Sequence, residues 1–482
     1  MLKWLRSRAE KFGKDKSEKN SSDNSGSVKS RPEKNRSEKN RPEKNNRGKK
    51  KNRKASASAV NYSGARIVPR SEHGISRKNI DESALKVLYR LNKEGYQAHL
   101  VGGAVRDLLL GRHPKDFDVA TDATPEEVKS LFRNCRLIGR RFRLAHLHFG
   151  RHIIEVATFR AAHGHSALGN QDASGRILRD NVFGDISEDA QRRDFTVNAL
   201  YYNVADFSVI DYAGGFEDIK NKRLRLIGDP EERYREDPVR MMRAIRFAYK
   251  LGFTIDESCR QFIIDQGALL QDIPSARIYD EVLKIFHSGH ARECLHGLLE
   301  YNLFQYLFPE AAEALKNNDT AMQFLILAMQ STDDRIQKDL PVTPAFLFAA
   351  LLWAPLQKGI EKRCNNGEHY AVAMQKVSEA LLSAQVQHIA IPRRFTMVVR
   401  DIWALQARLK HHTGKRATSA FEHPKFRAAY DFLCLRAKAG EDVAADCQFW
   451  TEFQQKMPST HSRPAPDSNH RRGPRRRRAK KD

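Results

Sequence analysis

The stretch "LVGGAVRDLLLGRHPKDFDVATDATPEEV" (residues 100–128) contains the signals that decide the fold. It begins with the end of an apolar strand, after which two glycines lead into a helix that Gly111 ends. The segment "DFDVAT" predicts a second strand, and Thr124 followed by Pro125 is typical of the start of another helix. Strands that alternate with helices in this way predict a mixed α/β domain.

Two glycines at the end of the first strand, Gly102 and Gly103, indicate one way to bind a phosphate. Glycines let a backbone approach a phosphate closely, and the start of the helix that follows favours an anion. Arg106, one turn into that helix, could add a charged donor. Taken alone the pattern is weak, because paired glycines at a strand end more often form only a turn. The Gly-Lys-Ser/Thr ending of the nucleotide P-loop is also missing.

Two aspartates, Asp116 and Asp118, flank Phe117 in the second strand. Alternate residues of a strand point to the same face, so the two carboxylates repel each other unless a cation lies between them. Mg²⁺ suits this position because it binds through a few carboxylates, water and substrate phosphates, and paired ions support phosphoryl transfer. An isolated Asp-x-Asp is usually a solvated strand edge, but this one closely follows the two glycines and Arg106.

The 482 residues divide into a folded part and two tails. Residues 66–225 are expected to form the α/β head, in which the strands "RFRLAHLHFG" and "HIIEVATFR" follow the first helices. Residues 226–290 and 291–460 are expected to be successive amphipathic helices, a neck and a body. The most apolar segment, "PAFLFAALLWAPL" (344–356), is too short to span a membrane and predicts a buried helix.

The net charge of +25 is concentrated at the two ends of the chain. Residues 1–54 carry +13 and residues 461–482 carry +7, which leaves only +5 for the rest. The repeat "RPEKNRSEKNRPEKNNR" contains no apolar residue, so we expect a disordered basic arm over 1–65 and a disordered arginine-rich tail over 461–482. Such tails favour a polyanion, with a nucleic acid as the best candidate, although basic tails can also serve solubility alone.

The cysteines and the first residues bear on the compartment. Six cysteines are scattered singly, so neither zinc-knuckle nor redox spacing is present, and a reducing compartment is indicated. The first twenty residues have no apolar run after their charges, unlike a secretory signal. We therefore expect a cytoplasmic protein without a membrane span.

Four motifs occur in the order found in one enzyme family. Residues 100–128 closely resemble the head motif of the class II nucleotidyltransferases, which contain the tRNA CCA-adding enzymes and the bacterial poly(A) polymerases. "RRDFTVNALYY" (192–202) is similar to the second motif, and "YAGGFEDIKNKRLRLIGDP" (212–230) to the strand-and-turn segment after it. "REDPVRMMRAIRF" (235–247) resembles the helix that selects the nucleotide. The resemblance implies a head with the polymerase-beta-like nucleotidyltransferase fold and a helical body that binds RNA.

Further segments resemble the poly(A) polymerase branch of the family. These are "LIGRRFRLAHLHFG" (137–150), "EHPKFRAAYDFLCLRA" (422–437) and the arginine-rich tail. The implied reaction is template-independent transfer of AMP from ATP to RNA 3′-hydroxyl ends with release of pyrophosphate, which would promote RNA turnover. The alternative within the family is a CCA-adding tRNA nucleotidyltransferase, and a third interpretation is a non-catalytic RNA-binding protein with a decayed transferase head.

The resemblance implies two Mg²⁺ ions held by Asp116 and Asp118, with a third carboxylate nearby. Asp194 lies inside the second motif and is the preferred third acid. Glu155, the only acid in the apolar strand "HIIEVATF", is the alternative. A structural explanation of Asp194 is an ion pair with one of the two arginines that precede it.

The resemblance also implies which residues bind ATP. Asp237 and Arg240 lie three residues apart, share a helix face and would select the incoming base, although an ordinary salt bridge is the commoner explanation of that spacing. The complete implied set is Gly102, Gly103, Arg106, Arg193, Asp237, Arg240 and Arg243.

Several other residue groups suit contact with RNA, each with a common alternative. Arg140, Arg141 and Arg143 could bind triphosphate or RNA, or form an exposed strand face. Aromatic residues between 415 and 437 could stack on bases, but aromatics at helical spacing more often belong to a core. The histidines between 146 and 165 are expected to contact solvent or substrate rather than zinc. RNA 3′ ends and ATP are the expected partners, RNA-decay proteins are further candidates, and a monomer is expected.

Overall fold

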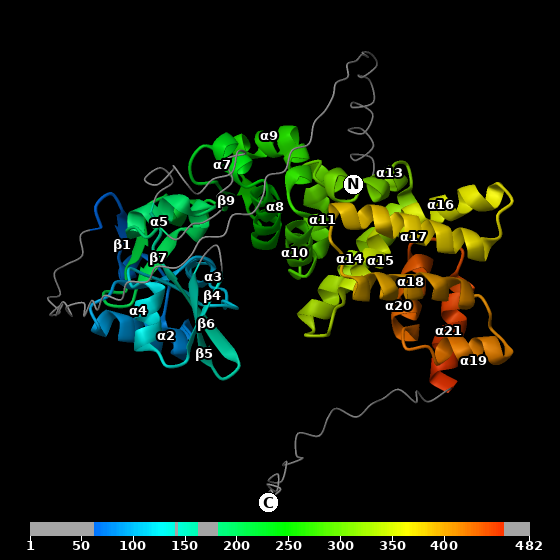
Figure 1. Ribbon diagram of the computed structural model, residues 1–482, viewed down its shortest axis with the longest axis horizontal. Helices are drawn as coiled ribbons and strands as arrows, with labels where there is room; N and C mark the ends of the chain where they lie inside the picture. Colours follow the sequence, from blue (N-terminus) through cyan, green and yellow to red (C-terminus); the bar gives the residue numbers. More distant parts are fainter. Residues whose placement is uncertain (1–61, 140–142, 162–181, 457–482) are drawn as a thin grey trace, which may run out of the picture.

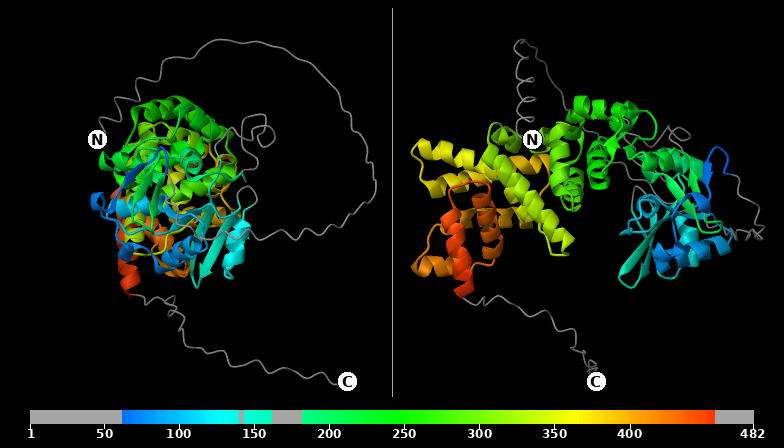
Figure 2. Two further views of the ribbon diagram at one scale, coloured as in Figure 1. Left: turned by 90° about the vertical axis from the view of Figure 1, so that its left-hand side faces the viewer. Right: turned by 180° about the vertical axis from the view of Figure 1, so that it is seen from behind.

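The computed structural model describes residues 62–139, 143–161 and 182–456. The described chain is elongated, with an α/β head at one end and helices in the neck and body (Figures 1 and 2). The predicted fold class, an α/β head followed by an all-α body, is confirmed. The disorder predicted for residues 1–65 and 461–482 falls outside the described residues except for residues 62–65, of which Tyr62 and Ala65 pack against a buried cluster. Arg140, Arg141, His163 and His165 also lie outside the described residues.

The head contains one mixed sheet, which has eight strands among the described residues. Their spatial order is β1-β8-β7-β2-β3-β6-β5-β4, and β3 and β6 are the parallel neighbours. The antiparallel pair expected after the first helices is confirmed as β5 and β6. The strands are β1 (Arg66–Val68), β2 (Ala98–Val101), β3 (Asp118–Thr121), β4 (Cys135–Ile138), β5 (Leu144–Phe149), β6 (His152–Thr158), β7 (Leu200–Asn203) and β8 (Val209–Asp211).

Helix α2 (Glu82–Lys93) covers one face of this sheet. Asp81 caps it by accepting hydrogen bonds from two backbone N–H groups of the first turn, at 2.7 and 3.2 Å. Its buried side runs from Ala84 to Leu91 at helical spacing and packs on the central strands. The capped amphipathic helix predicted from the sequence is therefore confirmed.

Helix α5 (Ile186–Arg192) covers the opposite face of the sheet. Ile186 and Ala190 pack against Val101 and Tyr201 in a small buried cluster. The neighbouring residue along each of those strands belongs to the main core on the side of α2. Because successive strand residues point to opposite faces, α2 and α5 lie on opposite sides of the sheet.

Two further helices of the head start where the sequence predicts. Helix α3 (Gly103–Leu109) follows the paired glycines, and helix α4 (Pro125–Leu131) follows Thr124. Thr124 and Glu127 form a reciprocal capping box, in which each side chain accepts a hydrogen bond from the backbone N–H of the other. This arrangement satisfies two backbone donors that a helix start otherwise leaves without partners.

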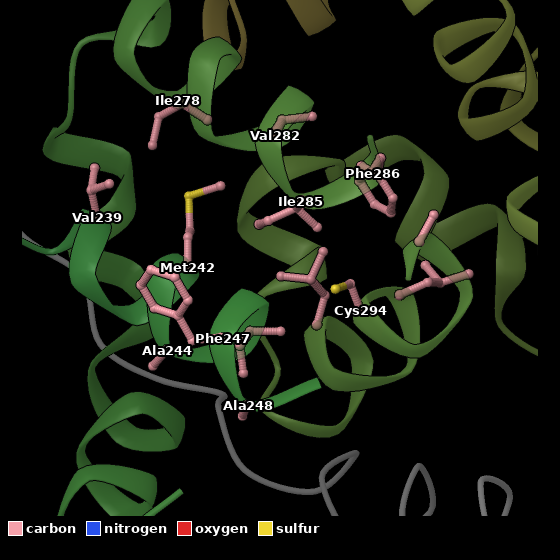
Figure 3. Packing of buried hydrophobic residues seen from close by; sticks show 14 of the residues in the cluster. Val239, Met242, Ala244, Phe247, Ala248, Ile278, Val282, Ile285, Phe286 and Cys294 are labelled. Carbon is pink, nitrogen blue, oxygen red and sulfur yellow. The ribbon is translucent and has the colours of Figure 1, made fainter. Parts of the chain in front are cut away.

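A neck of packed helices joins the head to the body. Figure 3 shows its interior, where Met242 of one helix lies opposite Ile278 and Ile285 of a neighbouring helix, all of them buried. The elements between the sheet and the body are α6 (Gly215–Lys220), β9 (Arg223–Leu224), α7 (Pro230–Glu236), α8 (Val239–Leu251), β10 (Thr254–Ile255), α9 (Glu257–Gln266), α10 (Ser275–Phe286) and α11 (Ala291–Glu300).

Strand β10 corrects the prediction that only helices follow residue 226. Its two residues pair in parallel with β9. Gly252 ends α8 with a φ of 74°, a left-handed conformation that glycine adopts readily, and turns the chain back. The N–H of Thr254 then donates to the carbonyl of Lys222 at 2.9 Å. Periodicity missed this strand because its partner lies far away in the sequence.

The body is built from helices that pack in pairs, such as α16 with α17 and α20 with α21. Its elements are α12 (Phe304–Leu307), α13 (Pro309–Leu315), α14 (Asp319–Gln337), α15 (Pro344–Leu351), α16 (Trp353–Asn365), α17 (Tyr370–His388), α18 (Arg393–Arg408), α19 (Gly414–Phe421), α20 (Phe426–Lys438) and α21 (Ala444–Lys456). The aromatic residues near 415–437 lie in hydrophobic clusters, which confirms the core interpretation over base stacking; they are Phe421, Phe426, Tyr430 and Phe432.

The apolar segment 344–356 is buried as predicted, although Leu352 divides it between α15 and α16. Among the described residues, no helix combines the length and the apolar character needed to cross a membrane.

Cys434 and Cys447 form a disulfide between α20 and α21. The expectation of singly scattered cysteines is therefore wrong for this pair, because antiparallel packing of the two helices brings both side chains together. The other four cysteines are free: Cys135, Cys259, Cys294 and Cys364.

Candidate active site

Asp116 and Asp118 lie at the start of β3, with buried Phe117 between them. Phe117 points into the core, and both aspartates are exposed to solvent. Asp116 precedes the first residue of β3, so the shared face of the two carboxylates stays a prediction.

The register of the sheet places one further acid beside Asp118. In the parallel pairing of β3 with β6, Asp118 lies directly opposite Glu155. Glu155 in turn lies opposite His146 of β5, whose Nε2 is 3.3 Å from the carboxylate. A single row across the sheet therefore carries Asp118, Glu155 and His146 on one face.

The electrostatics of this row favour a cation. Partial burial raises the pKa of Asp118 to about 6, and the charges of Glu155 and Asp116 add to the rise. Arg193 and His146 act in the opposite direction but do not cancel it. A carboxylate held near other carboxylates in this way binds a proton or a metal ion more readily than an isolated one.

The few carboxylates of this row fit Mg²⁺ better than a metal ion that needs all of its ligands from the protein. In the described part of the chain, no three His, Cys, Asp or Glu side chains converge as a ready metal site. Mg²⁺ needs fewer protein ligands, since it retains waters and is completed by substrate phosphates. The residues that would hold it are Asp116 and Asp118, with Glu155 next to them.

Asp194, the preferred third acid, has a different environment. It accepts hydrogen bonds from the backbone N–H of Phe195 at 2.8 Å and from the side chain of Asn198 at 3.1 Å. Its other oxygen pairs with Arg243 of α8, whose Nε lies at 2.9 Å. Burial opposes the charged form, but Arg243 and these donors hold the pKa of Asp194 well below its usual range. The structure thus pairs Asp194 with the neck, neither with Asp118 nor with the two preceding arginines.

The paired glycines form the turn that the sequence predicts. Gly102 has a φ of 73° and a ψ of −134°, a combination open essentially to glycine alone. A Cβ at Gly102 would lie 3.5 Å from Nη1 of Arg193, and one at Gly103 would lie 3.5 Å from Nη2 of Arg106. The guanidinium groups of Arg193 and Arg106 therefore lie close to the backbone of Gly102 and Gly103, which no side chain covers.

Arg193 is oriented by residues that the sequence analysis did not single out. Its Nε and Nη2 donate to Oδ2 of buried Asp189 at 3.1 and 2.9 Å. The same Nε donates to the hydroxyl of Tyr201 at 3.0 Å, and that hydroxyl donates to Asp189 at 2.7 Å. Asp189 lies four residues before Arg193, a spacing that could have signalled an ion pair.

Arg106 is buried, and its guanidinium is bound by neighbouring residues of the protein. Nη1 donates to Asn198 at 2.6 Å, and Nε and Nη2 donate to Asp107 at 2.9 and 2.7 Å. Its guanidinium also lies 5.2 Å from the ring centre of Phe247. The charged fork expected to point at a phosphate instead joins α3 to α8.

Asp237 and Arg240 are not on one continuous helix, which corrects the expected shared helix face. Helix α7 ends at Glu236, and Asp237, with a φ of −147° and a ψ of 88°, is outside the helical region, as expected for a residue before a proline. Arg240 donates to Glu236 at 2.8 Å, while Asp237 accepts from Arg277 at 2.6 Å. The expected Asp237–Arg240 salt bridge is thus replaced by two separate pairs.

Two residues from the strand region near 140 can also be placed. Arg143 forms an ion pair with Glu126 of α4. His148 lies on β5 two residues after His146, and so on the same face, as expected from strand alternation.

Comparison with known proteins identifies the family. Three family models match: the poly A polymerase head domain over residues 98–225, the probable RNA and SrmB-binding site of polymerase A over 252–315, and the polymerase A arginine-rich C-terminus over 366–482. Poly(A) polymerase I of Escherichia coli O6:H1 is 52% identical over 401 residues, which are 81% of this chain and 86% of that protein. The chain belongs to the poly(A) polymerase family.

Relatives and folds agree with this membership. Poly(A) polymerase I of Haemophilus influenzae is 45% identical, over 80% of this chain and 88% of its own. The CCA-adding enzyme of Lactobacillus helveticus is 39% identical over only 46% of this chain and 53% of its own. The predicted enzyme class, a nucleotidyltransferase of the poly(A) polymerase type, is therefore confirmed at the level of the family.

Solved structures support the fold of this poly(A) polymerase family member. A tRNA nucleotidyltransferase complexed with a primer tRNA and an incoming ATP analog has a TM-score of 0.55 at 22% identity, and covers 77% of this chain and 98% of its own. A tRNA-processing enzyme with CTP has a TM-score of 0.54 at 22% identity, with 78% and 93% covered. At this identity the likeness shows the fold only.

Proposed function

We propose that this chain transfers AMP from ATP to the 3′-hydroxyl of RNA without a template, using Asp116, Asp118 and Glu155 as the metal-binding acids. The carrying observation is the β3–β6 register, which places Glu155 directly beside Asp118 in a chain 52% identical to a named poly(A) polymerase I. In the reaction, the RNA O3′ forms a bond to the α-phosphorus of ATP. The bond from that phosphorus to the bridging oxygen breaks, pyrophosphate leaves, and the hydroxyl proton passes to solvent.

Bound Mg²⁺ would lower the pKa of the attacking hydroxyl and neutralise the leaving group, as in other two-metal phosphoryl transfers. The role of the carboxylates would be to hold the Mg²⁺ at the start of β3. The bound cation would in turn relieve the repulsion between the negatively charged side chains. Asp194 is proposed to anchor Arg243 instead of binding metal, because its carboxylate is already occupied.

Arg193 is proposed to bind the triphosphate. Asp189 and Tyr201 hold its guanidinium next to the backbone of Gly102, where the missing Cβ leaves room for a phosphate oxygen. Its charge also acts on Asp118, so it lies within electrostatic reach of the metal-binding row. Gly103 and Arg106 would support the turn without contacting the phosphate.

Asp237 is proposed to read the base edge. In the described residues its Oδ1 is buried and makes no hydrogen bond, while Oδ2 is held by Arg277. A free carboxylate oxygen accepts hydrogen bonds, which suits the exocyclic amine of adenine. Arg240 and Arg243 are engaged by Glu236 and Asp194, so we assign them the positioning of this segment.

We propose the partners and the compartment from the family and from the positive charge at the two ends of the chain. The neck matches a family model described as a probable RNA-binding site, and the two ends of the chain carry most of the net positive charge. We propose a cytoplasmic monomer that promotes RNA turnover, with RNA-decay proteins as candidate partners.

One assay distinguishes this reaction from CCA addition. The protein is incubated with a generic RNA and with a tRNA lacking its terminal CCA, in Mg²⁺ and each nucleotide singly. Long tails made from ATP alone support the proposal. Addition that requires CTP and stops after three nucleotides would show a CCA-adding enzyme, and no incorporation would show a protein that only binds RNA.

The residue assignment is tested with matched acid-to-amide variants. Asp118→Asn and Glu155→Gln are each expected to lower kcat by roughly 10²-fold or more, because metal charge stabilisation is worth several kcal/mol, while RNA binding persists. Glu82→Gln, an exposed acid on α2 paired with Lys86, is the control and should retain full activity. Full activity of Glu155→Gln would remove Glu155 from the metal site.

A further inference from the structure

A pocket lies in the head on the side opposite the carboxylates. It has a volume of about 430 Å³, and its walls come from the segment before α2, from α2 itself and from the turn between β7 and β8. Tyr202 lines it, whereas Tyr201, the next residue along β7, lies in the cluster on the other face. We name it the rear pocket; the residues that matter for its chemistry are Arg70, Arg77, Lys78, Tyr89, Tyr202 and Phe207.

Three cations surround this pocket, and its lining contains no acid. Arg70, Arg77 and Lys78 are all exposed and line the pocket together. The nearest turn carries Asp206, whose Oδ1 accepts from the N–H and the hydroxyl of Ser208, and this single carboxylate stands against three cations. The pocket is thus positively charged and has room for an anionic group of nucleotide size.

Two of the cations are already held in place. The guanidinium of Arg77 lies 4.5 Å from the ring centre of Phe207 and donates to the hydroxyl of Tyr89 at 3.1 Å. The guanidinium of Arg70 lies 5.3 Å from the same ring. These contacts already position the side chains of Arg70 and Arg77. A ligand that binds to them would therefore cost little side-chain entropy.

Phe207 holds this arrangement in a conformation that costs energy. Its φ is 63°, which is rare for an aromatic residue, and His73 fixes the turn by a 2.9 Å contact between Nε2 and the carbonyl of Phe207. Strain of this kind persists only where the surrounding contacts require the conformation. Here it places an aromatic ring against two arginines at the pocket wall.

The pocket also offers a free hydroxyl and a free aromatic face. Tyr202 lines the pocket, is almost wholly buried, and its hydroxyl makes no hydrogen bond within the described residues. Tyr89 is 43% exposed. An unpartnered donor and an open ring beside cations are the groups that a phosphate and a base require.

We propose that the rear pocket binds one nucleotide of a single-stranded RNA at a point remote from the active site. Arg70, Arg77 and Lys78 contact backbone phosphate, and Tyr89 stacks on a base. The inference rests on the proposed function only in taking RNA as the substrate. It adds a docking point on the face of the sheet opposite Asp118, so that a long RNA contacts both sides of the head.

RNA is favoured over the other ligands of this charge. An acidic peptide would use the cations but would leave the open ring and the donor hydroxyl without function. The pocket residues also follow the strongly basic residues 1–54 closely in sequence, a charge that favours a polyanion as the ligand of this part of the chain.

The first experiment compares two triple variants of the full chain. Arg70→Ala/Arg77→Ala/Lys78→Ala removes the rear-pocket cations. The control Lys86→Ala/Lys93→Ala/Lys129→Ala removes the same charge from exposed lysines of α2 and α4. Affinity for oligo(A) of roughly 30 nucleotides is measured by fluorescence anisotropy without ATP, in EDTA, over a range of salt concentrations. We expect the pocket variant to bind at least about five-fold more weakly and to lose about 2 from its salt slope, beyond any effect of the control.

The second experiment separates the pocket from the active site. A primer of about six nucleotides, close to the smallest size of a single-stranded binding site, should accept its first AMP at the wild-type rate in the pocket variant. Tyr89 should cross-link to 4-thiouridine RNA but not to azido-ATP. Equal binding by the two triple variants, or a Tyr89 cross-link to azido-ATP alone, would overturn the proposal. Because binding and cross-linking need no catalysis, absence of tailing by the wild type would refute the proposed function without deciding this one.

Discussion

At the scale of single residues, Asp194 shows how a motif acid can join domains. Its carboxylate accepts from Asn198 within the head and from Arg243 on the first long helix of the neck. The side chain of Arg243 is 31% exposed, while that of Asp194 is 12% exposed, so the pair is shielded only in part. The contact holds α8 against the head, and Asp237 lies in the short break between α7 and α8.

Asp194→Asn is expected to lower the free energy of unfolding by about 3 kcal/mol, the lower end for buried pairs, because Arg243 loses its partner. The folded pKa of Asp194 is depressed, so the stabilisation is present above the unfolded pKa of about 3.9 and is lost as the pH falls through the folded pKa. Urea unfolding of wild type and variant between pH 2 and pH 7 should therefore give a constant difference at neutral pH that shrinks below about pH 4. A difference that does not change with pH would contradict the ion-pair role.

At the scale of elements, helix α3 is bounded by two glycines with positive φ but unequal surroundings. Gly102 precedes the helix beside Arg193, while Gly111 follows it with a φ of 68° and open space where a Cβ would lie. The first glycine therefore adjoins Arg193, whereas the second only ends the helix.

Gly102→Ala and Gly111→Ala make a matched pair for this difference. Both are expected to lower the free energy of unfolding by about 1–3 kcal/mol, because alanine tolerates positive φ poorly. Only Gly102→Ala should also raise KM for ATP, since its methyl group enters the space beside Arg193. Thermal unfolding and ATP titrations of both variants check this. An equal KM for ATP in the two variants would show that the turn at Gly102 does not take part in nucleotide binding.

At the scale of the whole molecule, most of the net positive charge lies in different parts of the chain from the folded core. The head, neck and body hold the hydrophobic core and the row of Asp118, Glu155 and His146, whereas most of the net charge lies in residues 1–54 and 461–482. Binding to RNA phosphates should therefore depend strongly on the ends of the chain, and chemistry should not.

Deletion of residues 1–54 and 461–482 tests this separation. Cutting at 54 retains Tyr62 and β1, which pack on the head. The truncated protein should bind RNA more weakly and with a flatter salt dependence, because fewer counterions are released, and should still add a single AMP to a short primer. An unchanged slope of log affinity against log salt would count against an electrostatic role of the tails.

Local signals in the sequence determined the elements of the head. The cap at Asp81, the capping box at Thr124 and the paired glycines each depend on neighbouring residues, so they could be read directly and are found where expected. The helix break at Pro238 is equally local, because proline restricts the residue before it, but the motif resemblance obscured it. The family could also be recognised from the order of its motifs.

Only the tertiary structure decided which distant groups meet. The β3–β6 register brings Glu155 beside Asp118, α8 brings Arg243 to Asp194, and the packing of α20 on α21 joins Cys434 to Cys447. Each of these pairings depends on where whole elements pack, and that is set by burial of apolar surface over the entire core rather than by the residues that meet. The pair of aspartates in "DFD" could therefore be found from spacing, whereas the position of Glu155 opposite Asp118 depends on the β3–β6 register.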